Sequence, residues 1–159
     1  MIIVIPMAGK SQRFHEAGYT EPKFKLSLAG RSVFSYAVGS FEAYFRSNSF
    51  LFIHRDEEGI DSFIIAECKK MGIKNTNLVG LSKPTRGQAE TVAQGLNAME
   101  IGNTEPITIF NIDTFRPGFN FPDHLNLDQI DGYLEVFRGS GPNWSYVRPA
   151  DSGDCQAAE

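Results

Sequence analysis

The residues best suited to chemistry lie in a loop near the start of the chain, over residues 6–14. After an apolar run, this loop contains in order Ala8, Gly9, Lys10 and Ser11. Small residues let successive backbone N–H groups approach a ligand closely and form a nest for an anion. Arg13 can add a bidentate fork for phosphate. The loop is neither a Gly-x-Gly-x-x-Gly nor a Walker sequence, so an ordinary strand-to-helix turn is the alternative.

Two further charged residues could act with this loop. Pro22 restricts the backbone beside Lys23 and helps to point its ammonium group, a compact charge suited to phosphate. Asp113 ends another apolar run, and Mg²⁺ typically takes one or two carboxylates together with substrate phosphates. Taken alone, a surface turn would explain Lys23 and a turn-capping role would explain Asp113. Whether Lys23 and Asp113 can act together with the loop therefore depends on where the fold places them.

The charge distribution supports a site for a small anion. The net charge of −4 argues against general nucleic-acid binding. Residues 10–31 nevertheless hold five cations and two anions, a balance of +3, which leaves −7 for the rest of the chain. A solvated surface loop is the alternative explanation of such a cluster.

The composition is that of an ordinary globular domain. The chain has 159 residues, of which 42% are hydrophobic and 21% are charged, so disordered and coiled-coil classes are excluded. No apolar run approaches the ~20 residues that span a bilayer, and the opening apolar run is too short to predict a signal peptide. Two cysteines, Cys68 and Cys155, make no disulfide framework. We therefore expect a cytoplasmic protein that does not bind a membrane.

The elements that must position these residues alternate along the chain. Short apolar runs predict strands at residues 2–5, 50–53, 77–79 and 107–110. Helical periodicity predicts helices at residues 33–45, 60–71 and 89–99, with Ser32 as the cap of the first and Gly72 ending the second. Residues 7–32 show no periodicity and read as a loop.

This order predicts an α/β fold, a three-layer α/β/α sandwich with a mostly parallel central sheet. Ligands of such sheets bind outside the carboxyl ends of the strands. The loop after the first strand, the segment 81–88 and Asp113 all lie at such ends. Residues distant in the sequence can therefore meet in one crevice.

The pattern weakens after Asp113. Two further strands are expected, at residues 131–137 and 144–147, and the small polar residues 151–159 read as a frayed tail. The predicted organisation is one α/β domain over residues 1–150, followed by this tail.

Four segments recur in this order in one family. They are residues 6–14, the pair Pro22 and Lys23, residues 85–91 (Thr-Arg-Gly-Gln-Ala-Glu-Thr) and residues 111–113 (Asn-Ile-Asp). Together they resemble the sugar-phosphate nucleotidyltransferases with a glycosyltransferase-A-like fold, particularly the capsule-biosynthesis branch. The resemblance covers about residues 2–148.

The resemblance implies a role for each site residue. Ala8 and Gly9, with Lys10 and Ser11, would hold the nucleotide, and Arg13 would hold the triphosphate. Lys23 would stabilise the α-phosphate during transfer. Gly87 and Gln88 would contact the base, and Asp113 would bind Mg²⁺.

The implied reaction moves a nucleoside monophosphate from a nucleoside triphosphate, with CTP or UTP and dTTP favoured, to a phosphorylated acceptor. The acceptor would be a sugar phosphate or a similar capsule or surface-polysaccharide precursor, and pyrophosphate would be released. The attacking phosphate oxygen is already ionised near pH 7, so positioning and charge neutralisation suffice. The absence of a catalytic Ser/His/Asp or Cys/His set agrees with this chemistry.

The sequence departs from the family pattern because members usually continue for dozens of residues past its end. We therefore expect a C-terminally truncated form that binds nucleotide better than it turns it over, and a tendency to form homo-oligomers. Two other functions stay open. One is a glycosyltransferase of related fold that uses Asp113, although Asn111 stands where a second acidic residue is usual. The other is a non-catalytic nucleotide-binding module.

Overall fold

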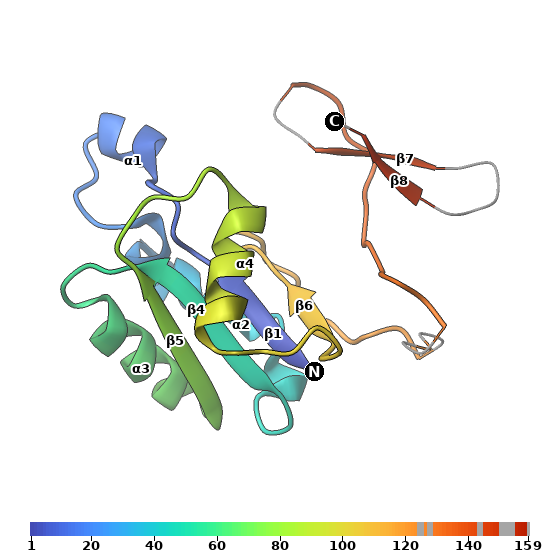
Figure 1. Cartoon of the computed structure of the whole chain (residues 1–159). Coiled ribbons are helices and arrows are strands. Elements are labelled where there is room, and N and C mark those ends of the chain that lie inside the picture. Colours follow the sequence, from blue (N-terminus) through green and yellow to red (C-terminus); the bar gives the residue numbers. More distant parts are fainter. Residues whose placement is uncertain (124–125, 127–128, 143–144, 150–154, 159) are drawn as a thin grey trace. The chain divides into compact units, whose positions relative to one another are not determined.

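The computed structural model describes residues 1–123, 126, 129–142, 145–149 and 155–158, and groups the chain into two compact units, Met1–Asp123 and His124–Glu159 (Figure 1). The sequence instead predicts a domain over residues 1–150 and a tail over residues 151–159. Residues 151–154 and 159 of that tail lie outside the described residues. The division at residue 150 therefore stays a prediction.

The first unit is built on a four-stranded parallel sheet. Its strands are β1 (Ile2–Pro6), β4 (Ser49–Arg55), β5 (Asn75–Leu81) and β6 (Ile107–Ile109). They lie in the order β5-β4-β1-β6, and in this register Ile3 pairs with both Phe50 and Thr108. The four predicted strands and their parallel arrangement are confirmed.

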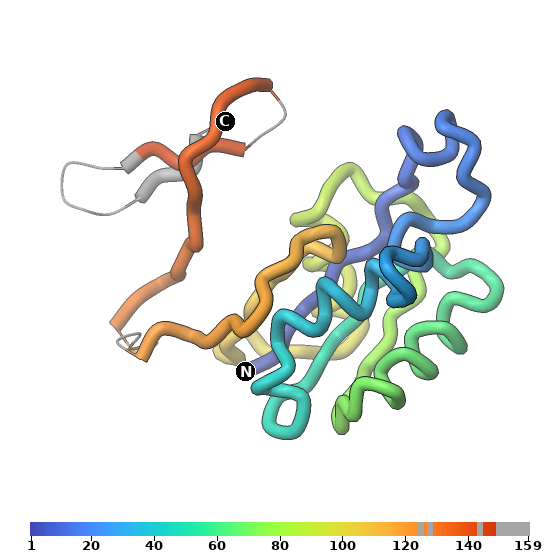
Figure 2. The backbone as a smooth tube through the Cα atoms, turned by 180° about the vertical axis from the view of Figure 1, so that it is seen from behind, coloured from blue at the N-terminus to red at the C-terminus, as the bar shows by residue number. Residues whose placement is uncertain are grey.

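Helices cover both faces of this sheet and complete the predicted three layers. On one face, α2 (Val33–Gly39) and α3 (Ile60–Met71) pack on a core that includes Ile3, Ile5 and Phe52. On the other face, α4 (Gln88–Ala98) packs on Val4 and Leu51. The front and back views show α4 on one side of the sheet and α2 and α3 on the other (Figures 1 and 2). The alternation of side chains along β1 and β4 thus divides the core into two clusters.

Two sequence expectations in this unit are wrong. Residues 7–32, expected as a loop, contain a one-turn helix α1 (Gln12–Glu16), a 3₁₀ turn η1 (Lys23–Lys25) and a hairpin of β2 (Ser27–Leu28) and β3 (Arg31–Ser32). These elements are too short to produce a periodic pattern. The helix expected over residues 33–45 ends at Gly39 and is followed by the 3₁₀ turn η2 (Glu42–Tyr44). The ring of Phe41 packs edge-on against Phe110 at 4.9 Å, so tertiary packing bends the chain here.

The second unit contains a two-stranded antiparallel sheet of β7 (Tyr146–Pro149) and β8 (Cys155–Ala158). The strand expected at residues 144–147 begins at Tyr146, and Trp144 lies outside the described residues. The strand expected at residues 131–137 does not form. No helix in the described part of the chain is both long and apolar enough to cross a membrane.

The predicted signals at the start of α2 and at the end of α3 are found in the structure. Ser32 caps α2, because its Oγ accepts a hydrogen bond from the Ser35 N–H at 3.1 Å. Gly72 ends α3 in the left-handed conformation at φ 78°, where glycine carries no Cβ penalty.

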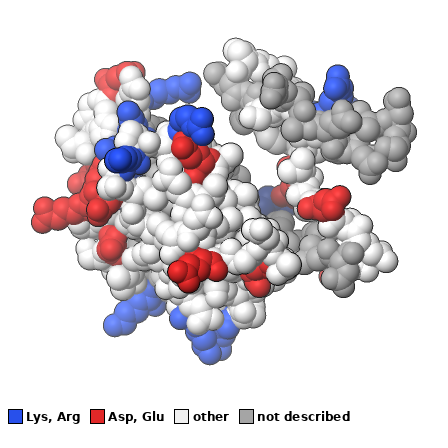
Figure 3. All heavy atoms as spheres, viewed as in Figure 1, with Lys and Arg blue, Asp and Glu red and all other residues white. Residues whose placement is uncertain are grey.

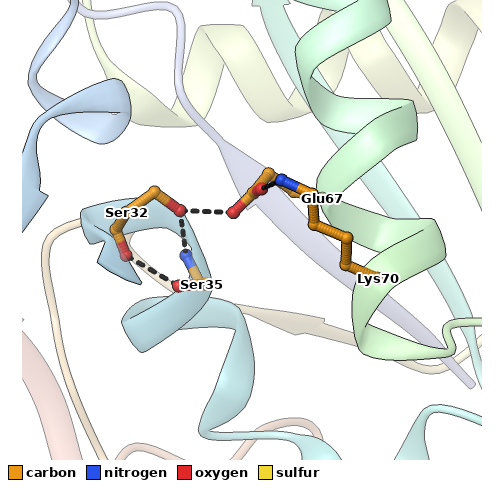
Figure 4. A network of polar contacts seen from close by, with 4 residues as sticks. All are labelled: Ser32, Ser35, Glu67 and Lys70. Atoms are coloured by element: carbon orange, nitrogen blue, oxygen red, sulfur yellow. Dashed lines mark hydrogen bonds and ion pairs between the residues drawn. The ribbon is translucent and has the colours of Figure 1, made fainter. Parts of the chain in front are cut away.

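A polar network ties α2 to α3 on the outside of the core (Figure 4). The Ser32 hydroxyl donates to Glu67 Oε2 at 2.5 Å, and Lys70 Nζ lies 2.7 Å from Glu67 Oε1. Burial tends to raise the pKa of the Glu67 carboxyl, but the hydrogen bonds from Lys70 and Ser32 and the charges of Lys70 and Arg31 outweigh it and lower the pKa. The ionised form of Glu67 is therefore the one that joins the helices.

We predict that Glu67→Gln lowers the free energy of unfolding by about 1–2 kcal/mol at pH 7, because hydrogen bonds to a charged group are lost. The pKa of Glu67 is lower in the folded state, so its contribution is present above the ordinary carboxyl value and is lost as the pH falls through the folded value. Urea unfolding of both proteins from about pH 7 to pH 3 should show the difference shrinking at acidic pH. A constant difference, equal to that of the exposed Glu58→Gln control, would contradict this.

A second prediction concerns Gly95, which is buried in the middle of α4. A Cβ atom at Gly95 would lie 2.2 Å from Ile53 Cδ1 and 2.5 Å from Ile53 Cγ1. Gly95→Ala should therefore destabilise the protein by about 1–3 kcal/mol through overpacking, although alanine alone favours a helix. In thermal unfolding, Ile53→Val should partly rescue Gly95→Ala because it removes the nearest atom. Additive effects of the two substitutions would show that the close approach is not the cause.

Candidate functional site

The carboxyl ends of β1, β5 and β6 open onto one cleft of about 410 Å³. Four segments distant in the sequence line it: the loop after β1, the residues Lys23 and Phe24, the segment before and into α4, and the residues after β6. Figure 3 shows Lys and Arg side chains, together with Asp and Glu side chains, at the end of this unit that carries α1, and further Lys and Arg side chains at the opposite end. The crevice expected at the carboxyl edge of the sheet therefore exists.

The cleft brings together eight of the nine predicted site residues: Ala8, Gly9, Lys10, Ser11, Lys23, Gly87, Gln88 and Asp113. The ninth, Arg13, lies exposed on α1 and does not line the cleft. The structure thus gathers residues from positions 8 to 113, while the roles assigned to them stay predictions.

The loop after β1 is tied to the sheet at its start and ends in a left-handed residue before α1. The Met7 N–H donates to the Ile53 carbonyl of β4 at 2.8 Å, which ties the start of the loop to the sheet. Ser11 adopts the left-handed conformation at φ 49° and ψ 32° immediately before α1. A non-glycine residue in this region is uncommon and concentrates at functional turns. The loop backbone is therefore held in a defined shape at the edge of the cleft.

An ion pair crosses the cleft. Lys23 Nζ lies 2.6 Å from Asp113 Oδ2, and the two side chains are 26% and 53% exposed. Each partner has a buried apolar neighbour: Phe24 packs on Phe63 of α3 with ring centroids 5.9 Å apart, and Ile112 belongs to the same core cluster. These anchors hold Lys23 and Asp113 at the surface of the cleft and facing each other.

Hydroxyl contacts hold the segment that leads into α4. Thr91 is buried, and its hydroxyl donates to the Gly87 carbonyl at 3.0 Å. Since that hydroxyl has one proton, the Thr85 hydroxyl is the donor in the 2.6 Å contact between the two threonines. A backbone hydrogen bond and a side-chain hydrogen bond from Arg86 lower the pKa of Glu90, so this carboxyl is ionised at neutral pH.

Side-chain amides join this segment to the end of β6. Gln88 Nε2 donates a short hydrogen bond to Asn111 Oδ1, and both residues line the cleft. The sequence predictions give no role to Asn111, Thr85 or Thr91. All three belong to the recurring segments, so their positions were visible in the sequence, whereas their partners were not.

The donor set of the cleft fits Mg²⁺ bound together with phosphate. Mg²⁺ prefers oxygen ligands and usually keeps one or two carboxylates plus substrate phosphates. Asp113 offers a carboxylate, and the Asn111 amide oxygen lies in the same lining. Among the described residues, no three of His, Cys, Asp and Glu gather at one place. Asp113 supplies the carboxylate of this lining, and its role as the residue that would hold the ion stays a prediction.

Comparison with known proteins identifies related structures. No protein-family model and no curated protein sequence matches this chain. The solved structure of the nucleoside-diphosphate-sugar pyrophosphorylase from Vibrio cholerae RC9 is similar to it, with 48% sequence identity over 95% of this chain and a TM-score of 0.85. This chain spans 62% of the length of that chain. A UDP-glucose pyrophosphorylase solved with UDP-glucose shows a slight likeness, with 18% identity over 70% of this chain and 45% of that chain and a TM-score of 0.49.

The fold class follows from these observations. The parallel sheet in the order β5-β4-β1-β6, with helices on both faces, is the nucleotidyltransferase-like, Rossmann-like α/β arrangement shared with the Vibrio structure.

We predict that Thr91→Val loosens the cleft segment without changing the fold. Valine has the shape of threonine but cannot bond to Thr85 or Gly87, so the free energy of unfolding should fall by about 1–3 kcal/mol. Amide hydrogen exchange of residues 85–88 should become faster than in the wild type. Thr104→Val, in an exposed turn, is the matched control. Equal exchange at residues 85–88 in both variants would contradict the anchoring role.

Proposed function

We propose that this chain binds a nucleoside triphosphate as part of a nucleotidyltransferase. The enzyme would transfer a nucleoside monophosphate to a sugar phosphate or a similar phosphorylated capsule or surface-polysaccharide precursor and release pyrophosphate. The observation that carries this proposal is the single cleft that gathers eight residues predicted to bind nucleotide. The 48% identity to a protein described as a nucleoside-diphosphate-sugar pyrophosphorylase supports it.

In this proposal the lining segments of the cleft contact different parts of the nucleotide. Backbone N–H groups of residues 8–11 hold phosphate, with Lys10 adding charge. Gly87 and Gln88 face the base, with CTP or UTP and dTTP as the favoured substrates. Arg13, which lies on α1 outside the cleft lining, reaches toward the triphosphate, and Lys23 contacts the α-phosphate.

In this reaction the protein needs only to position the substrates and to neutralise charge. An oxygen of the acceptor phosphate bonds to the α-phosphorus, and the bond from the α-phosphorus to the bridging oxygen breaks as pyrophosphate leaves. The attacking oxygen is already ionised, so no side chain needs to remove a proton. Lys23 neutralises charge that builds on the phosphoryl oxygens, and the loop after β1 keeps the attacked phosphorus in place. When bound at Asp113, Mg²⁺ supplies further charge neutralisation.

We propose a cytoplasmic location for the protein. Two alternative functions use the same cleft. A glycosyltransferase of related fold would bind a nucleotide-sugar and release no pyrophosphate. A non-catalytic module would bind nucleotide without any turnover. Pyrophosphate release from CTP, UTP, dTTP and GTP with a panel of sugar phosphates separates these functions from the one proposed.

The binding step is tested by thermal unfolding with each triphosphate and Mg²⁺. A ligand at 100 times its dissociation constant stabilises the folded state by about 2.7 kcal/mol, which raises Tm by several degrees. Arg13→Ala and Lys23→Ala should each weaken binding by about tenfold to a hundredfold, because a charged hydrogen bond contributes about 1.5–3 kcal/mol.

Lys74→Ala removes an exposed lysine outside the cleft lining and serves as the control. The proposed binding is wrong if no triphosphate raises Tm. The assignment of Lys23 is wrong if its alanine variant binds as tightly as the control.

A further inference from the structure

Lys23 and Asp113 are assigned to different parts of the proposed substrate, yet the structure pairs them with each other. Lys23 would contact phosphate and Asp113 would hold Mg²⁺, but their charged groups lie 2.6 Å apart. At this distance the ammonium group donates a hydrogen bond directly to the carboxylate. While the pair is intact, one N–H of Lys23 and one carboxylate oxygen of Asp113 bond to each other and not to the substrate.

The competition for Asp113 follows from charge. Mg²⁺ binds oxygen at about 2.0–2.1 Å, and the Lys23 ammonium already lies against Oδ2 of the same carboxylate. A second cation on this carboxylate would meet a positive charge within a few ångströms, and like charges at such separations repel. The ion pair therefore opposes binding of a metal ion to the nucleotide-free cleft.

A polyphosphate would reverse this balance. The cleft lining contains two lysines, Lys10 and Lys23, and one aspartate, Asp113, so an anion is attracted to it. A phosphate oxygen beside Lys23 is, like the carboxylate oxygen, a negatively charged acceptor, so the Lys23 ammonium group can bond to it instead. Once Lys23 turns to phosphate, Asp113 regains an uncompensated charge at the edge of the cleft.

We propose that Lys23 hinders metal binding at Asp113 while the cleft is free of nucleotide, and that both side chains change partners when a metal–nucleotide complex binds. This inference rests on the proposed function. Lys23 moves from the carboxylate to phosphate, and the carboxylate is released for the metal ion. The buried neighbours Phe24 and Ile112 keep both backbones in place, so the exchange needs only side-chain rotation. Metal and nucleotide then promote each other's binding, because a coupling free energy acts equally in both directions.

The test measures metal and nucleotide separately in Lys23→Met, which removes the charge and keeps an unbranched side chain. Mn²⁺ replaces Mg²⁺, and paramagnetic broadening of the Asp113 and Thr114 backbone amide signals in NMR reports binding even when it is weak. Without nucleotide, Lys23→Met should bind Mn²⁺ about two- to fivefold more tightly than the wild type, the range expected when a partly exposed ion pair is removed. The same variant should bind the magnesium triphosphate about tenfold more weakly.

Lys25→Met is the matched control, because Lys25 lies in the same 3₁₀ turn but pairs with Glu21 at 3.8 Å and does not line the cleft. It produces the same change in net charge and should leave Mn²⁺ broadening at Asp113 as in the wild type. Lys23→Arg keeps a cation that can pair with the carboxylate and should show no gain. Asp113→Asn should lose the site-specific broadening.

The outcomes distinguish the hindering role of Lys23 from the proposed function. If Lys23→Met binds Mn²⁺ no more tightly than Lys25→Met, the exchange of partners is overturned, even if nucleotide binds. If Lys23→Met gains Mn²⁺ affinity but no triphosphate binds the wild type, the hindering role of Lys23 is supported and the proposed function fails. The metal experiment contains no nucleotide, so its result does not depend on which triphosphate the protein uses.

Discussion

β1 pairs in parallel with β4 on one side and with β6 on the other, and this double pairing determines where the site can form. Parallel strands place all their carboxyl ends at one edge of the sheet, so the segments that follow β1, β5 and β6 converge there. Ile3 and Ile5 are fully buried on one face, and Val4 is fully buried on the other. A central strand packed on both faces cannot shift its register without moving these side chains into the wrong layer.

The rigid sheet supports a cleft in which three pairs of polar side chains bond to each other. Lys23 pairs with Asp113, Gln88 bonds to Asn111, and Thr91 bonds to Thr85. Of these contacts, the threonine pair includes a buried side chain, and the other two contacts are exposed. An exposed pair can exchange its hydrogen bonds for bonds to a ligand at little cost in free energy. A buried group that loses its partner is left unsatisfied, which costs the full free energy of desolvation. The threonines are therefore suited to holding the segment, and the charged and amide pairs to meeting a ligand.

The sequence predicts the parts of this arrangement that depend on apolar patterns. β1 and β4 are short apolar runs because they are covered on both faces, and α3 shows periodicity up to Gly72. The elements in residues 7–32 have two to five residues each, which is too few to establish a period. The early end of α2 at Gly39 depends on aromatic packing around Phe41, including Phe110, which lies 69 positions further along the chain. Propensity within one segment cannot reveal such a contact.

The same distinction applies to the cleft. Topology alone places the loop after β1, the segment before α4 and Asp113 at one edge, and this could be predicted. The pairing of Lys23 with Asp113 depends on how η1 lies against α3, which the packing of Phe24 on Phe63 determines. Phe24 and Ile112 are buried directly beside the two charged residues, so each charge is carried on a backbone that the core holds fixed. An apolar residue next to a charged one thus has a function in the site: it limits the movement of Lys23 and Asp113 to their side chains, which is the movement that a change of partner requires.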